Sequence, residues 1–179
     1  MTTVLRFLTM TSPIEDLMLA TSATAVHVLD YGAYADRMHE LLARRYGANG
    51  YTLDADAPGL DVRPQLQAYF AGDLQAIADI AVDTGGTPFQ QQVWQALRTI
   101  APGTTATYAM QAERIGHPTA TRAVGRTNGL NPIAIIVPCH RVVGSNGTLT
   151  GYAGGLARKA WLLRHEGWPG ITAQSTLSL

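Results

Sequence analysis

The segment over residues 135–143, which reads Ile-Ile-Val-Pro-Cys-His-Arg-Val-Val, constrains the fold most strongly because it is largely apolar and contains the single cysteine of the chain. The pattern predicts a buried strand that stops or bulges at Pro138, since proline has no N–H to donate to a neighbouring strand. Cys139 and His140 follow the proline directly. A thiol and an imidazole presented at the end of a strand suggest a nucleophile. A cysteine packed in an ordinary core is the alternative.

The low cysteine content limits the chemistry that the chain can perform. With one cysteine in 179 residues, the chain forms no internal disulfide and no thiolate metal cluster, and no other residues have the spacing of metal ligands. We therefore expect no metal and, without a cofactor motif, no cofactor. The hydrophobic content of 46% indicates a globular protein. The sequence shows neither a secretory signal nor an apolar run of about 20 residues, so we expect a cytoplasmic protein without a membrane span.

The two halves of the chain differ in charge, although the formal net charge is zero. Residues 1–85 carry five basic and eleven acidic side chains, a net charge of −6, whereas residues 86–179 carry eight basic and two acidic ones, a net charge of +6. A basic half predicts an anionic partner such as nucleic acid. The alternative is that these basic residues line solvated helix surfaces. Without a sustained heptad pattern, we expect a monomer.

The first part of the chain, residues 1–82, predicts a small amino-terminal α/β domain with an antiparallel sheet and a supporting role. Its apolar runs and turn residues predict strands over 3–9, 17–20 and 25–29 and helices over 34–46 and 64–70. Residues 54–61 predict an acidic loop, and residues 83–86 a linker. We assign no chemistry to this part.

Residues 87–169 predict a mainly helical domain, which gives the chain an α+β fold class. Thr87, Pro88 and Gln90 form the signature of a capping box, so a helix should begin here. The final helix is expected over residues 156–165, and a loose tail over 170–179.

Two short helices are expected over residues 108–115 and 119–128, on either side of the turn at 116–118. This arrangement predicts a helix-turn-helix. The second helix would expose small side chains together with Arg122 and Arg126, which suits close approach to nucleic acid. A plain helical hairpin is the alternative.

Two loop motifs lie between the reactive segment and the final helix. Asn146-Gly147 predicts a hairpin turn after the reactive strand. The glycine-rich stretch 151–155 lacks the spacing of a phosphate-binding fingerprint. We expect its glycines to let the backbone pack against a flat ligand.

Six short blocks occur in one order along the second half of the chain: Tyr108, Arg122 to Gly125, Asn131-Pro132, Pro138 to Arg141, Gly151 to Leu156, and His165 to Gly167. In this order they closely resemble the O6-alkylguanine-DNA alkyltransferase family. The resemblance is dense from Thr87 to Gly167 and looser over residues 1–85, where the Ser12-Pro13 turn and the strand order still match.

The resemblance implies catalytic roles for five residues. Cys139 would accept the alkyl group, His140 would be the base that acts through a water molecule, and Glu166 would orient and charge-stabilise the imidazole. Asn131 would brace the segment between the helix pair and the reactive strand. Tyr108 would donate a hydrogen bond to the flipped guanine and crowd the adjacent phosphate.

The resemblance also implies which residues contact the base and the duplex. The carbonyl groups of Cys139 and Val142 would accept from the exocyclic amine of the base, while Tyr152 and the amide of Ala153 would line the pocket near O6. Arg122 would enter the duplex and fill the space left by the flipped base. The other positions matched to DNA contacts are Gln90, Ala109, His117, Ala123, Gly125 and Ser145.

The sequence departs from the family at a few positions. Ala153 stands where some members have serine, and Ala109 and His117 differ in type from some relatives. The amino-terminal zinc site known in some relatives is not evident here.

The expected partner is double-stranded DNA that contains O6-alkylguanine, and the expected reaction is irreversible, stoichiometric transfer of the alkyl group to Cys139, with O4-alkylthymine a poorer substrate. A modified base inside a duplex must be flipped out, which costs a few kcal/mol. One alternative is a non-catalytic protein that recognises alkylated bases and recruits other repair factors. Another is a cysteine hydrolase.

Overall fold

The computed structural model describes residues 2–171, which divide into two compact units. The N-terminal unit comprises residues up to Gly86 together with Pro132–Ile136, and the C-terminal unit comprises Thr87–Asn131 and the residues from Val137 onward. The predicted loose tail lies outside the described residues apart from positions 170 and 171. The functional division into a supporting domain and an alkyl-transfer domain stays a prediction.

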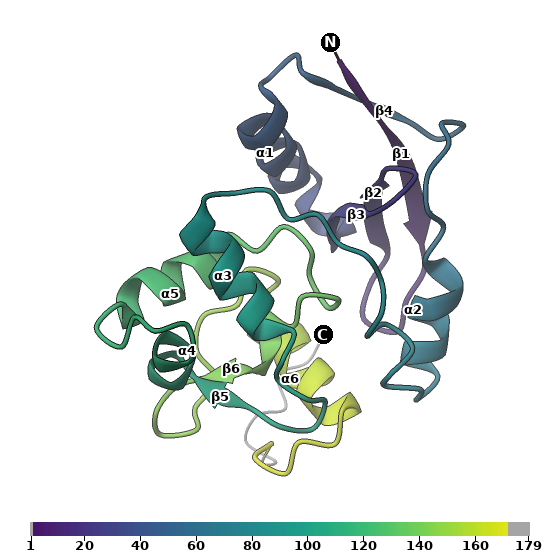
Figure 1. The fold of residues 1–179 in the computed structure, drawn as a ribbon. Coiled ribbons are helices and arrows are strands. Elements are labelled where there is room, and N and C mark those ends of the chain that lie inside the picture. The colour runs from purple at the N-terminus through teal and green to yellow at the C-terminus, as the bar shows by residue number, and fades with distance from the viewer. Residues whose placement is uncertain (1, 172–179) are drawn as a thin grey trace. The chain divides into compact units, whose positions relative to one another are not determined.

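A four-stranded sheet with the strand order β3-β2-β1-β4 forms the centre of the N-terminal unit (Figure 1). Its strands are β1 (Thr3–Met10), β2 (Leu17–Thr21), β3 (Val26–Tyr31) and β4 (Tyr51–Asp54). The first three pair antiparallel, as predicted, but β4 pairs parallel with β1. The prediction of an antiparallel sheet is therefore wrong, and the sheet is mixed. The crossover through a helix allows the parallel pairing. The sequence did not predict β4, because it has four residues and none of them is fully buried.

The helices of this unit follow the apolar pattern of the sequence. They are the 3-10 helix η1 (Gly32–Tyr34), α1 (Ala35–Tyr46) and α2 (Arg63–Phe70). Met38 and Leu42 of α1 pack on Leu5, Met18 and Val28 of the sheet in one buried cluster. The two α-helices therefore form where the sequence predicted them, to within one residue.

The segment Pro132–Ile136 joins the outer edge of β3, the end strand of the sheet, rather than forming a strand of its own. The Leu29 N–H donates to the Pro132 carbonyl oxygen at 3.0 Å, and the Ala134 N–H donates to the Leu29 carbonyl oxygen at 2.9 Å. Ile135 then adopts a φ of 68°, in the left-handed region that a branched residue rarely occupies. The predicted strand over residues 135–137 is therefore wrong. The residues are buried as expected, but the chain turns here instead of extending.

The C-terminal unit is mainly helical (Figure 1). Its elements are α3 (Pro88–Leu97), β5 (Ala106–Thr107), α4 (Tyr108–Arg114), α5 (Thr121–Gly129), the 3-10 helix η2 (Cys139–Arg141), β6 (Val142–Val143) and α6 (Leu156–His165). The predicted capping box is confirmed, because Thr87 and Gln90 bind each other's backbone N–H groups. A turn forms around Gly147, but residues 148–150 make no second strand, so the predicted hairpin is reduced to a turn.

A buried amide pair ties the predicted helix pair together and links it to α3. Gln111 of α4 and Asn128 of α5 exchange hydrogen bonds of 3.3 and 2.8 Å, and the Gln111 amide also donates to the Val93 carbonyl oxygen at 3.0 Å. The Trp94 indole of α3 donates to the Thr127 carbonyl oxygen at 3.0 Å. These bonds fix the three helices that carry most of the predicted DNA contacts.

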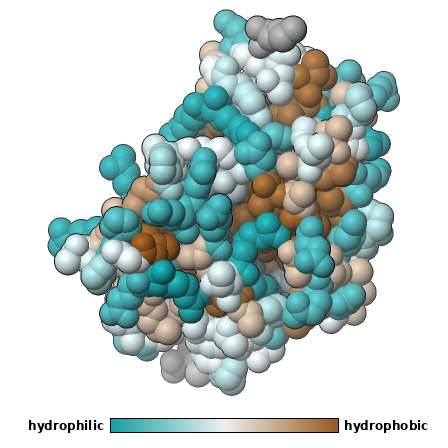
Figure 2. Space-filling view, viewed as in Figure 1, coloured by the Kyte–Doolittle hydropathy of each residue, from teal (hydrophilic) through white to brown (hydrophobic). Residues whose placement is uncertain are grey.

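The surface of the described residues carries few large exposed apolar side chains. Val4, Met110 and Leu156 are the ones that stand out in residues 2–171. Figure 2 shows hydrophilic residues over much of one face, with hydrophobic residues gathered in smaller patches. In the same range, no helix has the length and apolar character needed to cross a bilayer.

The amide pair gives a test of the helix packing. Gln111→Leu should lower the free energy of unfolding by about 1–3 kcal/mol, because Asn128 would keep a buried amide without its partner. In the double variant Gln111→Leu/Asn128→Leu, the two changes should together cost less than the sum of the single ones. Urea unfolding of the four proteins measures this coupling, and strict additivity would show that the pair does not hold α4 to α5.

Candidate active site

Cys139 begins a tight turn directly after Pro138. The Arg141 N–H donates to the Pro138 carbonyl oxygen at 3.0 Å, which closes the 3-10 turn of η2. In such a turn, successive side chains are rotated by about 120°, rather than pointing to opposite faces as they would in the predicted strand. Cys139 is buried, with 7% of its surface exposed.

Asn131 contacts both the chain just before Pro138 and the cysteine sulfur. Its Nδ2 donates to the Val137 carbonyl oxygen at 2.7 Å and lies 3.1 Å from Cys139 Sγ. The first bond links residue 131 to residue 137 and so holds the two ends of the intervening segment together. The second brings an amide N–H to the sulfur, and hydrogen bonding to a charged form favours that form. Asn131 is thus placed to support a thiolate.

His140 and Arg141, which follow the cysteine directly, form a buried group with Glu166 at the end of α6. Glu166 Oε1 lies 3.0 Å from His140 Nε2 and accepts from Arg141 Nη2 at 2.7 Å, while its Oε2 accepts from Arg141 Nε at 2.9 Å. Arg141 Nη1 also donates to the Ile100 carbonyl oxygen at 2.5 Å. The guanidinium therefore binds both carboxylate oxygens, and Oε1 is shared with the imidazole.

The protonation of this group follows from its burial. Complete burial lowers the pKa of His140, and the neighbouring Glu166 only partly opposes this effect. Burial also disfavours a charge on Glu166, but the contacts with His140 and Arg141 outweigh it and hold the pKa of Glu166 well below its usual range. We therefore treat Glu166 as ionised and His140 as neutral, with its proton on Nε2 facing the carboxylate. His140 Nδ1 is buried and has no hydrogen-bond partner among residues 2–171.

Lys159 brings a further cation into this region. It lies in α6 and is fully buried, and its Nζ donates to the carbonyl oxygens of Val142 at 2.5 Å and Thr150 at 2.7 Å. Burial lowers the pKa of Lys159 to about 8, and the charge at Cys139 opposes that shift. The ammonium and the sulfur thus attract each other when both are ionised.

Tyr108 stands at the start of α4, where Thr107 caps the helix. Its hydroxyl donates to the Thr150 carbonyl oxygen at 3.3 Å and lies 3.5 Å from that of Gly151. Gly125 lies beside the Tyr108 ring, where an added Cβ would approach to 3.6 Å. The structure therefore brings Tyr108 to the loop that carries Tyr152 and Ala153, which are both half-buried.

The residues predicted to contact DNA fall into two groups. The exposed ones are Arg122, Ala123, Ala109, His117 and Ser145. Gln90 and Gly125 are half-buried: the Gln90 side chain accepts from the Thr87 N–H at 2.9 Å within the capping box, and Gly125 packs on Tyr108. A structural role therefore accounts for Gln90 and Gly125 without any contact to DNA.

The sequence predicted no role for Arg141 and Lys159. Arg141 stands in the most specific sequence block, yet its contact with Glu166 depends on a residue 25 positions away. Lys159 did leave a signal, because it lies three residues after Leu156 and four before Leu163, on the apolar face of the predicted helix. A lysine on the apolar face of a helix is expected to be buried and to need partners for its ammonium group.

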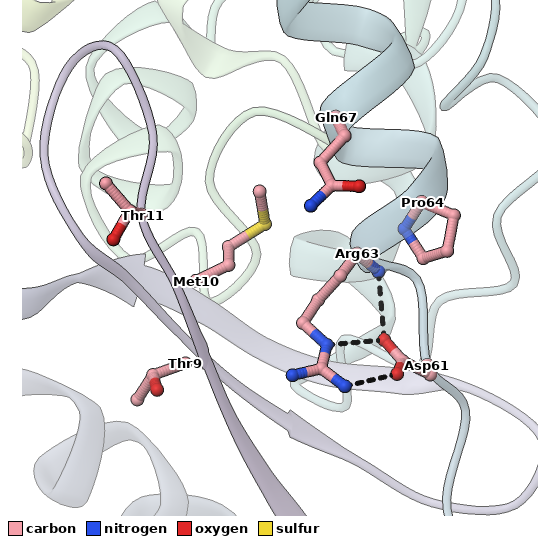
Figure 3. Close-up of a pocket in the computed structure, with 7 residues that line it drawn as sticks. All are labelled: Thr9, Met10, Thr11, Asp61, Arg63, Pro64 and Gln67. Atoms are coloured by element: carbon pink, nitrogen blue, oxygen red, sulfur yellow. Dashed lines mark hydrogen bonds and ion pairs between the residues drawn. The ribbon is translucent and has the colours of Figure 1, made fainter.

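A separate pocket of about 440 Å³ in the N-terminal unit contains none of the predicted site residues (Figure 3). It is lined by Thr9, Met10, Thr11, Asp61, Arg63, Pro64 and Gln67. Asp61 and Arg63 bind each other there at 2.5 and 2.8 Å, and this hydrogen bonding lowers the pKa of Asp61 to about 2. The charges in this pocket therefore neutralise each other, and the pocket offers no nucleophile. Within residues 2–171, no cluster of His, Cys, Asp and Glu could hold a metal ion.

Comparisons with known proteins identify the same part of the chain. The model of the 6-O-methylguanine DNA methyltransferase DNA-binding domain matches residues 88–168. The chain is 52% identical over 144 residues to a methylated-DNA–protein-cysteine methyltransferase of Salmonella typhimurium, which covers 80% of this chain and 84% of that relative. A crystal structure of Mycobacterium tuberculosis OGT in complex with DNA aligns with a TM-score of 0.73 and 44% identity over 92% of each chain. A methyltransferase structure from Pyrococcus kodakaraensis aligns with a TM-score of 0.63 and 25% identity, covering 91% of this chain and 99% of that one.

The Glu166 carboxylate gives a pH-dependent test. Glu166→Gln should lower the free energy of unfolding by about 3 kcal/mol at neutral pH, because the buried Arg141 would lose its counter-charge. In the wild type, the lowered pKa of Glu166 contributes stability that begins to be lost as the pH falls below 4.5, the ordinary value of this carboxyl. The difference between the two proteins should therefore shrink toward acid pH. Urea unfolding at a series of pH values measures it, and a constant difference would contradict the assignment.

Proposed function

The chain belongs to the O6-methylguanine DNA methyltransferase family, and we propose a residue-level route by which it repairs alkylated DNA. It binds DNA and has the activity of that family, the transfer of a methyl group from O6-methylguanine in DNA to a protein cysteine. Cys139 is the proposed acceptor. The observation that carries this assignment is the convergence of Asn131 on the sulfur and of Glu166 on the neighbouring His140.

In the proposed reaction, Cys139 Sγ attacks the alkyl carbon bound to guanine O6. A carbon–sulfur bond forms, the carbon–oxygen bond breaks, and the electron pair passes to the guanine. The thiolate is the reactive form of cysteine, and the Asn131 N–H and the Lys159 ammonium both favour it. The Tyr108 hydroxyl donates a hydrogen bond to the departing guanine anion, which takes up one proton from water and so becomes the unmodified base, while the proton that Cys139 loses to His140 returns to water.

His140 is the proposed acceptor of the thiol proton. With Nε2–H donating to Glu166, the basic atom of the ring is Nδ1, which has no partner among the described residues. The proton moves from Cys139 to this atom through a water molecule. Arg141 keeps the carboxylate ionised and fixed, so Glu166 can stabilise the imidazolium that forms.

The substrate is proposed to be double-stranded DNA with a flipped O6-alkylguanine. Arg122, exposed on α5, fills the space that the flipped base leaves, and the neighbouring small residue Ala123 allows the helix to approach the duplex. Phosphate contacts by the basic half of the chain carry no base information, so discrimination comes from the lesion, whose weaker pairing makes flipping easier. O4-alkylthymine is the poorer substrate.

The protein is proposed to act once, as a monomer. The thioether on Cys139 is stable, and the chain contains no second cysteine to remove the alkyl group. The need to keep this thiol reduced favours a cytoplasmic location.

The mass of the reacted protein gives the test of the proposed acceptor. Incubation with a duplex that contains O6-methylguanine should add about 14 Da, one methylene, to the peptide that holds Cys139, because the nucleophile keeps the group. The gain should reach one group per protein and be absent in Cys139→Ser. Binding without a mass change would favour the non-catalytic recognition protein, and product release over many turnovers would favour a cysteine hydrolase.

Arg122 should matter for duplex DNA and not for the pocket. In Arg122→Ala, we expect the rate of transfer from O6-methylguanine in a duplex to fall about 10-fold or more, because the flipped state would lose a side chain that holds the gap open. The rate with free O6-benzylguanine should stay at the wild-type value, since no base has to be flipped. Arg164→Ala, at an exposed position of α6, is the control. Equal losses with both substrates would place Arg122 in the pocket or the fold.

A further inference from the structure

The loop from Thr150 to Gly155 leads into α6 and has little regular structure of its own. Three of its six residues are glycines, and Gly151 and Gly155 have φ values of +42° and +86°. Glycine-rich backbone has access to many conformations. A defined conformation of this loop therefore requires anchors from other elements.

Two cations in the first turn of α6 bind carbonyl groups at the two ends of this loop. Lys159 Nζ donates to the Thr150 carbonyl oxygen at 2.7 Å and to that of Val142 in β6 at 2.5 Å. Arg158 Nη1 donates to the Gly154 carbonyl oxygen at 2.8 Å. Arg158 and Lys159 together form a cation clamp on the loop.

The position of the cation clamp opposes helix stability. The first turn of a helix carries a partial positive charge, so basic side chains there are unfavourable. Lys159 is in addition fully buried, and burying an ammonium is costly unless it is well bonded. The hydrogen bonds to the loop carbonyl groups offset the cost of the helix dipole and the cost of burial. They indicate that these two residues serve to hold the loop.

The clamp holds the part of the loop that the proposed function places against the lesion. Tyr152 and Ala153 are half-buried and lie between the two anchored carbonyls of Thr150 and Gly154. Tyr108, itself proposed to contact the guanine, reaches the Thr150 carbonyl oxygen from α4 at 3.3 Å. The first end of the loop is thus fixed from two helices, and the second end by Arg158.

We propose that the cation clamp sets the width of the lesion pocket, and thereby the size of the alkyl group that the protein accepts. This inference rests on the proposed function, because it takes Tyr152 and Ala153 as pocket-lining residues. A tightly held loop pre-organises the pocket for a small group, and a loosened loop admits a larger one while it positions a methyl group less well. Arg158 is the specificity-determining residue to vary, because the removal of the fully buried Lys159 endangers folding.

The experiment compares Arg158→Met, which removes the donor and keeps an apolar stem, with Arg164→Met, an exposed arginine in the last turn of the same helix. Single-turnover transfer rates are measured at saturating protein with two duplexes that differ only in O6-methylguanine or O6-benzylguanine. Amide hydrogen exchange of residues 150–155 is measured in parallel. In Arg158→Met, the ratio of the benzyl rate to the methyl rate should rise by about threefold to tenfold, the effect of one lost hydrogen bond, and the loop amides should exchange faster. Arg164→Met should keep the wild-type ratio and exchange.

An unchanged ratio in Arg158→Met would overturn the inference, and so would the same change in Arg164→Met. A fall of both rates by one factor would also overturn it, because a general loss of stability affects the two lesions alike. If the wild-type protein transferred neither group, the proposed function would fail. The hydrogen exchange of Arg158→Met would then still decide whether Arg158 holds the loop.

Discussion

The sharing of one buried carboxylate by Arg141 and His140 is the interaction on which the site depends. Glu166 accepts two hydrogen bonds from the guanidinium and keeps 3.0 Å contact with the imidazole. A buried carboxylate without a cation would take up a proton, and a protonated Glu166 could neither fix the ring tautomer nor stabilise an imidazolium. Arg141 prevents this by keeping Glu166 ionised, and the ionised carboxylate in turn opposes the lowering of the His140 pKa by burial.

The local backbone then places Cys139, the proposed nucleophile, beside this charge arrangement. The 3-10 turn that follows Pro138 rotates the Cys139 and His140 side chains by about 120° from each other, whereas a strand would point them to opposite faces. Asn131 closes the segment between residues 131 and 137 and donates to the sulfur with the same amide group. Within that segment, Ile135 holds a strained φ of 68°, which β3 of the N-terminal unit supports through two backbone hydrogen bonds. Strain of this kind persists only where surrounding contacts impose it.

The sequence predicted the parts of the fold that local rules control. The capping box at Thr87 and the span of α6 follow from the caps and periodicity of a few adjacent residues, and both are confirmed. The strand expected before Pro138 is wrong, because branched apolar residues indicate burial more reliably than they indicate conformation. Tertiary contact with β3 decided the conformation there. The parallel pairing of β4 depends on a crossover that no local pattern records. In the site, the residue types were evident, whereas the roles of Arg141 and Lys159 depend on carbonyls and carboxylates far away in the sequence.

The charge and tautomer that Glu166 imposes on His140 can be observed directly. Nitrogen-15 NMR of the unreacted protein, with the signal of His140 among the five histidines assigned through a His140→Gln variant, reports the charge and tautomer of the ring. The account predicts a neutral imidazole at neutral pH, with the proton on Nε2 and none on Nδ1. A charged ring, or a proton on Nδ1, would contradict it.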